Sequence, residues 1–169
     1  MGVEFGFKVH IIKPVTINSQ TVSSSRVREL IENGQVEKAS EFLGRPYSLT
    51  GPVIQGVKTG GKIGFPTANI DTRHVQVPGT GVYAVYIVCE DRRYRGVVNV
   101  GFNPTFHRDR LIVEVHILNF HEAIYGKDIE IEFIRRIRNE IEFQSADELV
   151  AQIKKDIETA KTLLEEQPS

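Results

Sequence analysis

The sequence predicts a mainly β domain, built as an antiparallel barrel or sandwich, with one long helix at its C-terminal end. Between residues 47 and 137, short apolar or alternating segments recur at hairpin spacing without a helical segment between them. A strongly amphipathic segment follows from residue 145. The first 44 residues differ, because their pattern predicts only a short strand and two short helices, too little to bury a core of their own.

Before the strand-rich region, the sequence predicts a strand followed by two helices. Residues 7–15 favour the strand. The serines at 23–25 can cap a helix that ends before Gly34, since a serine hydroxyl accepts a hydrogen bond from a free N–H group at a helix start. A second helix is expected at 37–43 and ends at Gly44.

The strand-rich region is expected to form hairpins. The run at 81–89 is nearly all apolar, which indicates a central strand, and a tight turn at 90–92 joins it to 93–100. We expect 111–118 to pair with 127–134 as a second hairpin. In the last of these strands hydrophobic and acidic residues alternate, which predicts one buried face. The predicted strands are 53–57, 81–89, 93–100, 111–118 and 127–134.

The C-terminal helix has a clear start signal. Ser145 and Glu148 form a capping box, in which side chains accept hydrogen bonds from free N–H groups of the first turn. The residues that follow place a hydrophobic stripe on one helix face, which is expected to pack on the outside of the barrel. The stripe comprises Ala146, Leu149, Val150, Ile153, Ile157, Ala160 and Leu164.

Composition narrows the class of protein. The 169 residues are 40% hydrophobic and 25% charged, which is typical of a folded globular chain. The net charge of −1 argues against a broad nucleic-acid binder, which is normally basic. No apolar run is long enough to span a membrane. The single cysteine, Cys89, cannot form an internal disulfide, so the sequence favours a cytoplasmic protein.

A glycine-rich segment between residues 56 and 69 is the first candidate binding site. It contains four glycines and two lysines, and it ends with Thr67 and Asn69. Glycines let backbone N–H groups approach a phosphate closely, lysine adds positive charge, and the threonine and asparagine oxygens suit Mg²⁺. The segment lacks the Walker A and dinucleotide-binding patterns. It predicts a nucleoside-triphosphate site, with a glycine-rich surface turn as the alternative.

An acidic residue inside an apolar strand is the second candidate site. If Val113 and Val115 face the core, Glu114 and His116 share the opposite face. A carboxylate at this position is costly unless it is paired or used in chemistry. Glu114 is therefore either a general base that takes a proton from a substrate hydroxyl or a structural partner of an arginine. The residues alone leave both roles open.

Taken together, these motifs resemble the riboflavin kinase family. The resemblance extends from Leu43 to about Leu164, and its most specific parts are Pro66-Thr67-Ala68-Asn69 and the later Glu114-x-His116. The motifs in chain order are Gly51-x-Val53-x-x-Gly56, Gly60-Gly61-Lys62-x-Gly64-Phe65-Pro66-Thr67-Ala68-Asn69, Val97-Val98-Asn99-Val100-Gly101, Asn103-Pro104-Thr105-Phe106, Val113-Glu114-Val115-His116-Ile117-Leu118 and Tyr125-Gly126-Lys127.

The resemblance implies a six-stranded antiparallel Greek-key barrel with a C-terminal helix. It also implies Mg²⁺-dependent transfer of the γ-phosphoryl group of ATP to the 5′-hydroxyl of riboflavin, giving FMN and ADP. By match, Glu114 would be the catalytic base, and Thr67 and Asn69 would bind the metal. The residues that match the flavin side are Asn69, Glu114, Arg138 and Phe143. The residues that match the ATP side are Gly56, Gly60, Gly61, Lys62, Gly64, Pro66, Thr67, His116, Asn119 and Tyr125.

Two positions depart from the family pattern. Lys62 stands where members often carry arginine, which keeps the positive charge but loses the two-pronged geometry of a guanidinium group. Asn119 stands where members often carry aspartate, outside the core chemistry.

The N-terminal piece resembles the end of the adenylyltransferase half of bacterial bifunctional riboflavin kinase/FMN adenylyltransferases. Residues 22–28 and 43–47 carry this likeness. That half normally contains an H-x-G-H motif, which the sequence lacks. We therefore expect an adenylyltransferase remnant at 1–44, a riboflavin kinase domain at 45–169 and a missing adenylyltransferase half as partner. The chain is expected to make FMN but not FAD.

Three other functions stay open on the sequence. A non-catalytic flavin-binding module or regulator would use the same barrel, but it would need neither the glycine-rich segment nor Glu114. A kinase for another small alcohol also fits, because the sequence describes the phosphate side of the site better than the acceptor side. A small nucleic-acid-binding barrel fits the fold class but lacks an aromatic-rich basic face.

Overall fold

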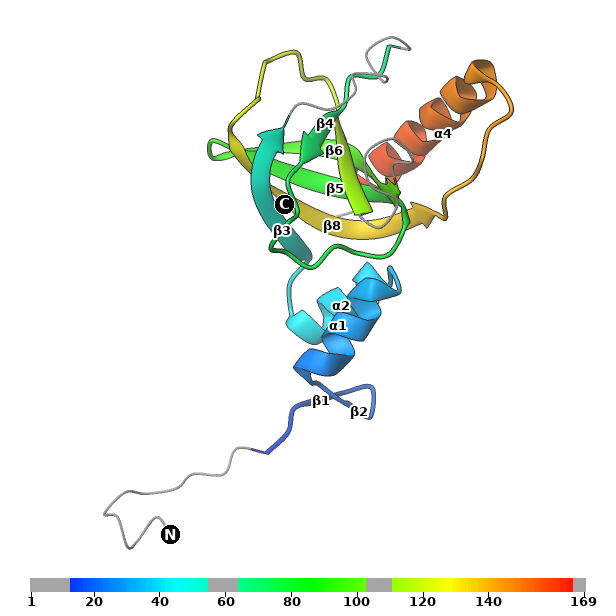
Figure 1. Cartoon of the computed structure of the whole chain (residues 1–169). Helices are drawn as coiled ribbons and strands as arrows, with labels where there is room; N and C mark the ends of the chain where they lie inside the picture. The colour runs from blue at the N-terminus through cyan, green and yellow to red at the C-terminus, as the bar shows by residue number, and fades with distance from the viewer. Residues whose placement is uncertain (1–12, 55–63, 103–110, 166–169) are drawn as a thin grey trace, which may run out of the picture.

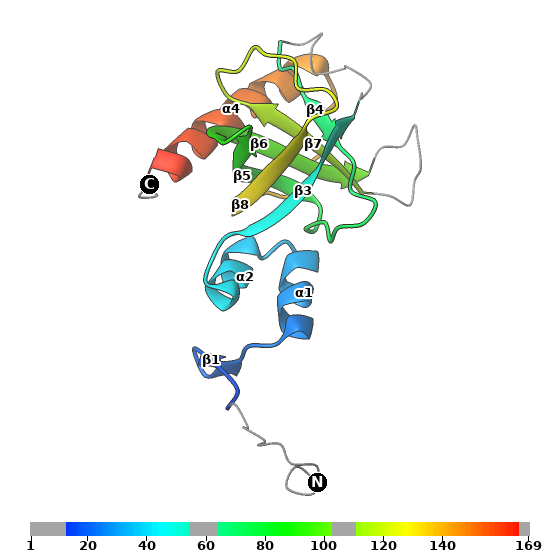
Figure 2. The same ribbon diagram turned by 90° about the vertical axis from the view of Figure 1, so that its left-hand side faces the viewer.

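A closed β-barrel carries one helix on its side and a pair of helices at its base (Figures 1 and 2). This computed structural model describes residues 13–54, 64–102 and 111–165. The main hydrophobic core fills the barrel, and smaller clusters lie within the helix pair and under the C-terminal helix.

Six antiparallel strands form the barrel in the spatial order β3-β4-β7-β6-β5-β8, and β8 closes it by pairing with β3. Strands β5 to β8 have the Greek-key order, because the fourth of them lies beside the first. The predicted fold class is confirmed. The strands are β3 (Tyr47–Ile54), β4 (Ala68–Ile70), β5 (Gly81–Cys89), β6 (Arg92–Phe102), β7 (Leu111–Ile117) and β8 (Asp128–Arg138).

Alternation along the strands divides the barrel into an apolar inside and a mixed outside. In β8, Ile129, Ile131 and Phe133 are buried, whereas the glutamates between them are partly exposed. The Phe133 ring packs against the rings of Tyr47 and Tyr83. The buried face predicted for this strand is confirmed.

The hairpin predicted from 81–89 and 93–100 is also confirmed, as β5 and β6 pair along their length. Glu90 and Asp91 at its turn both have a positive φ, 49° and 63°. This is the backbone form of a type I′ turn, whose twist matches that of the two strands it joins.

The predicted pairing of 111–118 with 127–134 is wrong. β7 pairs with β4 and β6, whereas β8 pairs with β3 and β5. The segment between β7 and β8 is therefore a connection across the barrel. The physical reason is that the barrel closes. β8 pairs with β5 on one side and with β3 on the other, which leaves the sheet without a free edge.

Two strand limits differ from the sequence prediction. The strand expected at 53–57 begins six residues earlier, as β3 at Tyr47, and residues 55–57 lie outside the described part of the chain. Gly51 takes the inward position between Leu49 and Val53. Because glycine has no side chain, the alternation of hydrophobic and polar residues is not visible in the sequence at this point. β4 is absent from the prediction because its three residues are too few to show a period.

The helix pair confirms the two helices predicted near the N-terminus as α1 (Ser24–Glu32) and α2 (Val36–Leu43). The Oγ of Ser23 caps α1 by accepting a hydrogen bond from the N–H of Arg26 at 3.2 Å. α2 ends at Gly44, whose φ of 69° is a conformation that favours glycine.

The strand expected at 7–15 is not found where the chain is described. Residues 13–15 are irregular, in keeping with the missing N–H of Pro14, and residues 7–12 fall outside the described ranges. A small hairpin of β1 (Thr16–Ile17) and β2 (Gln20–Thr21) follows instead.

Polar contacts attach the helix pair to the barrel. An Oε of Glu37 accepts a hydrogen bond from the backbone N–H of Arg136 at 3.1 Å and lies 3.7 Å from the Arg135 guanidinium. The N–H of Gly79 donates to the carbonyl of Ile31 at 2.9 Å. The domain boundary predicted at residue 44 stays a prediction. The contacts described here connect residues before this boundary with residues after it.

The C-terminal helix α4 (Ala146–Glu165) packs on the outside of the barrel, as the sequence predicts (Figure 1). The Oγ of Ser145 accepts a hydrogen bond from the N–H of Glu148 at 3.2 Å, which confirms the cap. The last turns of α4 pack against Ala84 and Tyr86 of β5. This contact explains why β5 is apolar on both faces.

Removing one hydroxyl from this contact is expected to weaken the attachment of α4. The Tyr86 hydroxyl donates a buried hydrogen bond to the carbonyl of Leu164 at 2.7 Å. Tyr86→Phe leaves that carbonyl unpaired, so the free energy of unfolding, measured in urea, should fall by about 1 kcal/mol. Tyr125→Phe is the control at an exposed ring and should change it by less than about 0.5 kcal/mol. Equal losses in the two variants would contradict this account.

Candidate functional site

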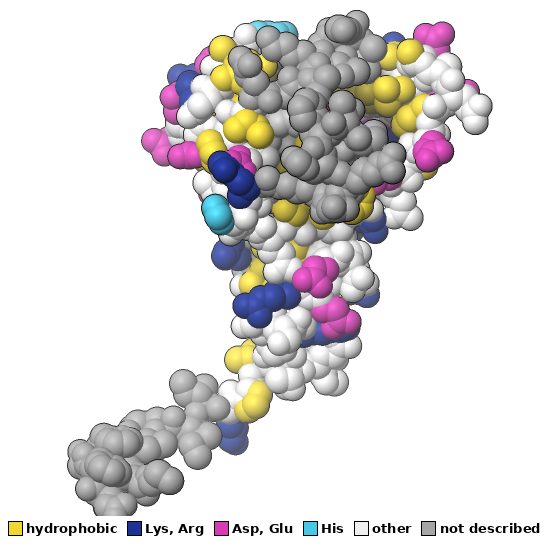
Figure 3. All heavy atoms as spheres, viewed as in Figure 1, with side chains coloured by type: hydrophobic (Ala, Val, Ile, Leu, Met, Phe, Trp, Pro, Cys, Tyr) yellow, Lys and Arg dark blue, Asp and Glu magenta, His cyan; other side chains and the backbone are white. Residues whose placement is uncertain are grey.

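A hollow of about 260 Å³ lies between the outer face of the barrel and the first half of α4, and we call it the helix-side hollow. The strands contribute mainly polar side chains to it, together with Val82 and Val97, whereas α4 contributes mainly apolar ones. Hydrophobic side chains reach the surface where α4 meets the barrel, and charges of both signs are interspersed on the same view of the molecule (Figure 3). The residues that line the hollow include Thr67, Asn99, Glu114, His116, Phe143 and Ile153.

Glu114 lies on the outer face of β7, in a row of polar residues. Its cross-strand neighbours are Asn69 on β4 and Asn99 on β6, and paired residues of this kind project from the same face of a sheet. Val113 and Val115 are buried inside the barrel, and this alternation fixes the outward direction of Glu114.

The environment of the Glu114 carboxyl group makes its charged form more costly than it is in water. Burial raises its pKa above the ordinary value of a glutamate. Within the described ranges, no lysine or arginine forms an ion pair with this carboxylate. The structural alternative considered for Glu114, an ion pair with an arginine, is therefore not found among these residues.

His116 connects β7 to the segment that leads into β4. Its Nδ1 lies 2.8 Å from the carbonyl oxygen of Pro66, and its ring meets the Phe65 ring edge-on at 5.8 Å between centroids. Gly64, where this segment begins, has a φ of 87° that glycine adopts without strain. These contacts hold Thr67, the next residue along, beside the outer face of β7.

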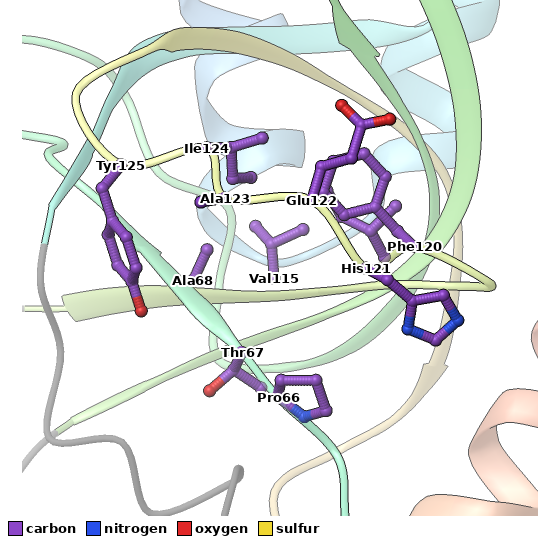
Figure 4. A pocket seen from close by; sticks show the side chains of 11 residues that line it. Pro66, Thr67, Ala68, Val115, Phe120, His121, Glu122, Ala123, Ile124 and Tyr125 are labelled. Carbon is purple, nitrogen blue, oxygen red and sulfur yellow. The ribbon is translucent and has the colours of Figure 1, made fainter.

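A second hollow, of about 270 Å³, opens under the segment between β7 and β8, and we call it the loop-side hollow (Figure 4). Residues 66–68 line it on one side and residues 120–125 on the other. Figure 4 shows the side chains of Thr67 and Tyr125 facing the same space, and Tyr125 is 48% exposed. Thr67 lines both hollows, whereas Glu114 lines only the helix-side hollow.

A family model described as Flavokinase: Riboflavin kinase matches residues 43–164. The chain belongs to the riboflavin kinase family. The bifunctional riboflavin kinase/FMN adenylyltransferases of Haemophilus influenzae and Bacillus subtilis are 43% and 42% identical to it, across 93% and 89% of this chain. These matches cover 51% and 49% of the two relatives, so the chain spans about half the length of the curated relatives it matches.

Solved structures show the same fold. One named as a macrolide-efflux protein from Streptococcus pneumoniae has a TM-score of 0.85 and 36% identity, covering 93% of this chain and 52% of that chain. A riboflavin kinase from Trypanosoma brucei has a TM-score of 0.51 and 24% identity, covering 72% of this chain and 81% of that chain. The second likeness concerns the fold alone.

Within the described ranges, no helix is both long enough and apolar enough to cross a membrane.

The residues predicted for the ATP side are divided between several places. Pro66, Thr67 and Tyr125 line the loop-side hollow, whereas His116 lines the helix-side hollow. Asn119 lines neither of them and belongs to a separate surface hollow beside Arg95. Gly64 lines neither hollow, and Gly56, Gly60, Gly61 and Lys62 lie outside the described part of the chain.

The residues predicted for the flavin side lie together on the other side of Thr67. Arg138 and Phe143 line the helix-side hollow with Glu114, and Asn69, which is 8% exposed, is the cross-strand neighbour of Glu114. Sequence reasoning missed Asp156, a buried residue of α4 that lines the same hollow. The sequence feature that could have indicated Asp156 is its position next to Ile157, a residue of the hydrophobic stripe of the helix.

The donor atoms around Glu114 fit a magnesium ion. Thr67 and Asn69, the residues predicted for the metal, offer neutral oxygens beside the Glu114 carboxylate, and Mg²⁺ prefers oxygen ligands. No group of three or more His, Cys, Asp or Glu side chains that could hold a metal occurs among the residues described. A site with one carboxylate is typical of Mg²⁺ bound largely through substrate phosphates and water.

Glu114→Gln is expected to make the protein more stable at neutral pH. The raised pKa means that the folded state binds the proton of this carboxyl more tightly than the unfolded state does. Ionisation therefore lowers stability, with no effect below the unfolded pKa and the full effect above the folded pKa. Urea unfolding should show an advantage for Glu114→Gln that grows as the pH rises above the ordinary pKa of a glutamate, about 4.3.

A matched variant separates this effect from a change in net charge. Glu158→Gln removes one charge from an exposed position on α4, where the Glu158 side chain is 71% exposed. An advantage of Glu114→Gln that does not change with pH, or that Glu158→Gln reproduces, would show that burial of the Glu114 carboxylate is not its cause.

Proposed function

We propose that this chain is a riboflavin kinase, which transfers the γ-phosphoryl group of Mg²⁺-bound ATP to the 5′-hydroxyl of riboflavin. The observation that carries the proposal is the position of Thr67, which lines both hollows. Substrates bound on its two sides would meet beside Glu114. The match to the riboflavin kinase family supports this pair of substrates.

The chemistry of the two hollows supports one substrate in each. In the helix-side hollow, Phe143 and Ile153 offer an apolar wall to the flat flavin ring, and the polar strand face offers partners to the ribityl hydroxyls. In the loop-side hollow, the exposed ring of Tyr125 offers a surface on which an adenine base can stack. The glycine-rich segment before Phe65 would supply N–H groups and Lys62 to the phosphates.

Glu114 acts as the base in the transfer. Its carboxylate accepts the proton of the 5′-hydroxyl as the hydroxyl oxygen bonds to the γ-phosphorus. The bond from that phosphorus to the bridging oxygen breaks, so FMN and ADP are the products. The raised pKa of Glu114 suits this role, because a stronger base takes the proton more readily. Thr67 and Asn69 would hold the metal ion, which neutralises charge on the phosphates.

The second activity named for the curated relatives is not proposed for this chain, because its sequence lacks the H-x-G-H motif. We propose that an adenylyltransferase half is the partner of this domain in a longer protein. Neither nucleic acid nor a membrane is proposed as a partner. A cytoplasmic location is proposed on the basis of Cys89, a buried free thiol.

The chain should form FMN, and no FAD, when it is incubated with riboflavin, ATP and Mg²⁺. Chromatography with fluorescence detection separates the three flavins. Glu114→Gln keeps the shape of the side chain but cannot accept the proton, so kcat should fall by about 10²- to 10⁴-fold. Riboflavin binding, measured by the change in flavin fluorescence, should stay close to that of the parent chain.

The outcomes of this experiment are distinct. Riboflavin binding without FMN formation by the parent chain would favour a non-catalytic flavin-binding module. FMN formation at an unchanged rate by Glu114→Gln would remove Glu114 from the role of base. FAD formation would show that an adenylyltransferase activity is present in spite of the missing motif.

Substitution of Thr67 or Asn69 should act mainly on the use of Mg²⁺ and ATP. Thr67→Ala and Asn69→Ala each remove a neutral oxygen, so the KM for ATP and the Mg²⁺ concentration for half-maximal rate should rise about tenfold or more. Thr50→Ala on the exposed face of β3 is the matched control and should leave both unchanged. A rise confined to the KM for riboflavin would contradict the assignment.

A further inference from the structure

The carboxylate of Asp156 is buried in the wall of the helix-side hollow. This residue of α4 is only 3% exposed. Its two oxygens share the single N–H of Arg138 Nε on β8, at 3.0 Å from each, and one of them also accepts a hydrogen bond from Nη2 at 2.8 Å. The other accepts a hydrogen bond from the side-chain amide of Gln152 at 2.8 Å. A paired contact of this kind fixes both groups in direction as well as in distance.

Further contacts hold Arg138 in place. Its remaining nitrogen, Nη1, donates to the carbonyl of Asn139 at 2.9 Å. The guanidinium carbon lies 5.9 Å from the centroid of the Phe143 ring, within the range of a cation–π contact. Each nitrogen of Arg138 therefore has a protein partner, and Arg138 and Phe143 line the hollow together.

The part of α4 that precedes Asp156 has less apolar burial than the part that follows it. Ala160 and Leu164 in the second half are buried against β5. Leu149 and Ile153 in the first half are only partly buried, because they line the open hollow. Apolar burial thus holds the end of the helix, and the Asp156–Arg138 pair joins the preceding part to β8.

We propose that Asp156 is a positioning residue for riboflavin, which acts through Arg138 and Phe143 to keep the wall of the helix-side hollow in its binding form. This inference rests on the proposed function for the identity of the ligand. None of the three residues lines the loop-side hollow. The effect of Asp156 is therefore confined to the acceptor side, and the binding of ATP does not depend on it.

The test compares two α4 carboxylates that each pair with a barrel arginine. Asp156→Asn removes the charge at the hollow, whereas Glu165→Gln removes it from the exposed pair with Arg95. Asp156→Asn should raise the Kd and the KM for riboflavin about five- to tenfold, while kcat and the KM for ATP change less than about twofold. Glu165→Gln should leave all four values within about twofold. Thermal unfolding establishes that each variant is folded at the assay temperature.

A second variant guards against misfolding of the first. Arg138→Lys keeps the charge opposite Asp156 but loses the paired geometry and the contact with Phe143, so it should also raise the Kd for riboflavin. An unchanged Kd in both variants, or equal losses for riboflavin and ATP, would overturn the proposal. If the parent chain binds riboflavin but makes no FMN, the proposed function fails while the Kd comparison still tests Asp156.

Discussion

Closure of the barrel permits only one outward direction for the side chains of β4, β7 and β6, and the candidate site depends on this constraint. Val113 and Val115 have to face the interior, so Glu114 cannot. The same rule turns Asn69 and Asn99 outward in register with it. A shift of one residue in the pairing of β7 would bury the carboxylate and expose two valines. The stability of the core thus fixes the position of the chemistry.

Thr67 lies between the two hollows and lines both of them, so the site has a helix side and a loop side. The segment that carries it is held by the contacts of His116 with Pro66 and Phe65. One hollow lies under the connection between β7 and β8, and the other lies under α4. The proposed phosphoryl transfer needs little covalent work from a protein but exact placement of two substrates, and a rigid sheet between two hollows would meet that need.

Local signals predicted much of this structure from the sequence. The cap at Ser145, the glycine at position 44 and the alternation in β8 each act within a few residues, and all three are found as expected. The partners of β7 were not predictable in this way, because they are set by closure between strands far apart in the chain. The grouping of Glu114, Thr67 and Phe143 was predicted from the family resemblance. Asp156 was missed because its partner, Arg138, lies on a different element.

The wall formed by α4 has a consequence for how new substrates can be acquired. One continuous stretch, residues 139–165, follows the last strand and supplies most of the apolar side of the helix-side hollow. The strands close on one another without it, so this stretch can change in sequence while the hydrogen-bonded sheet stays the same. Under the proposed function, the apolar wall for the acceptor and the strand residues assigned to the phosphates are thus encoded in separable parts of the gene. Libraries of this one stretch would vary the apolar wall for other flavin-like alcohols while Thr67 and Glu114 stay unchanged.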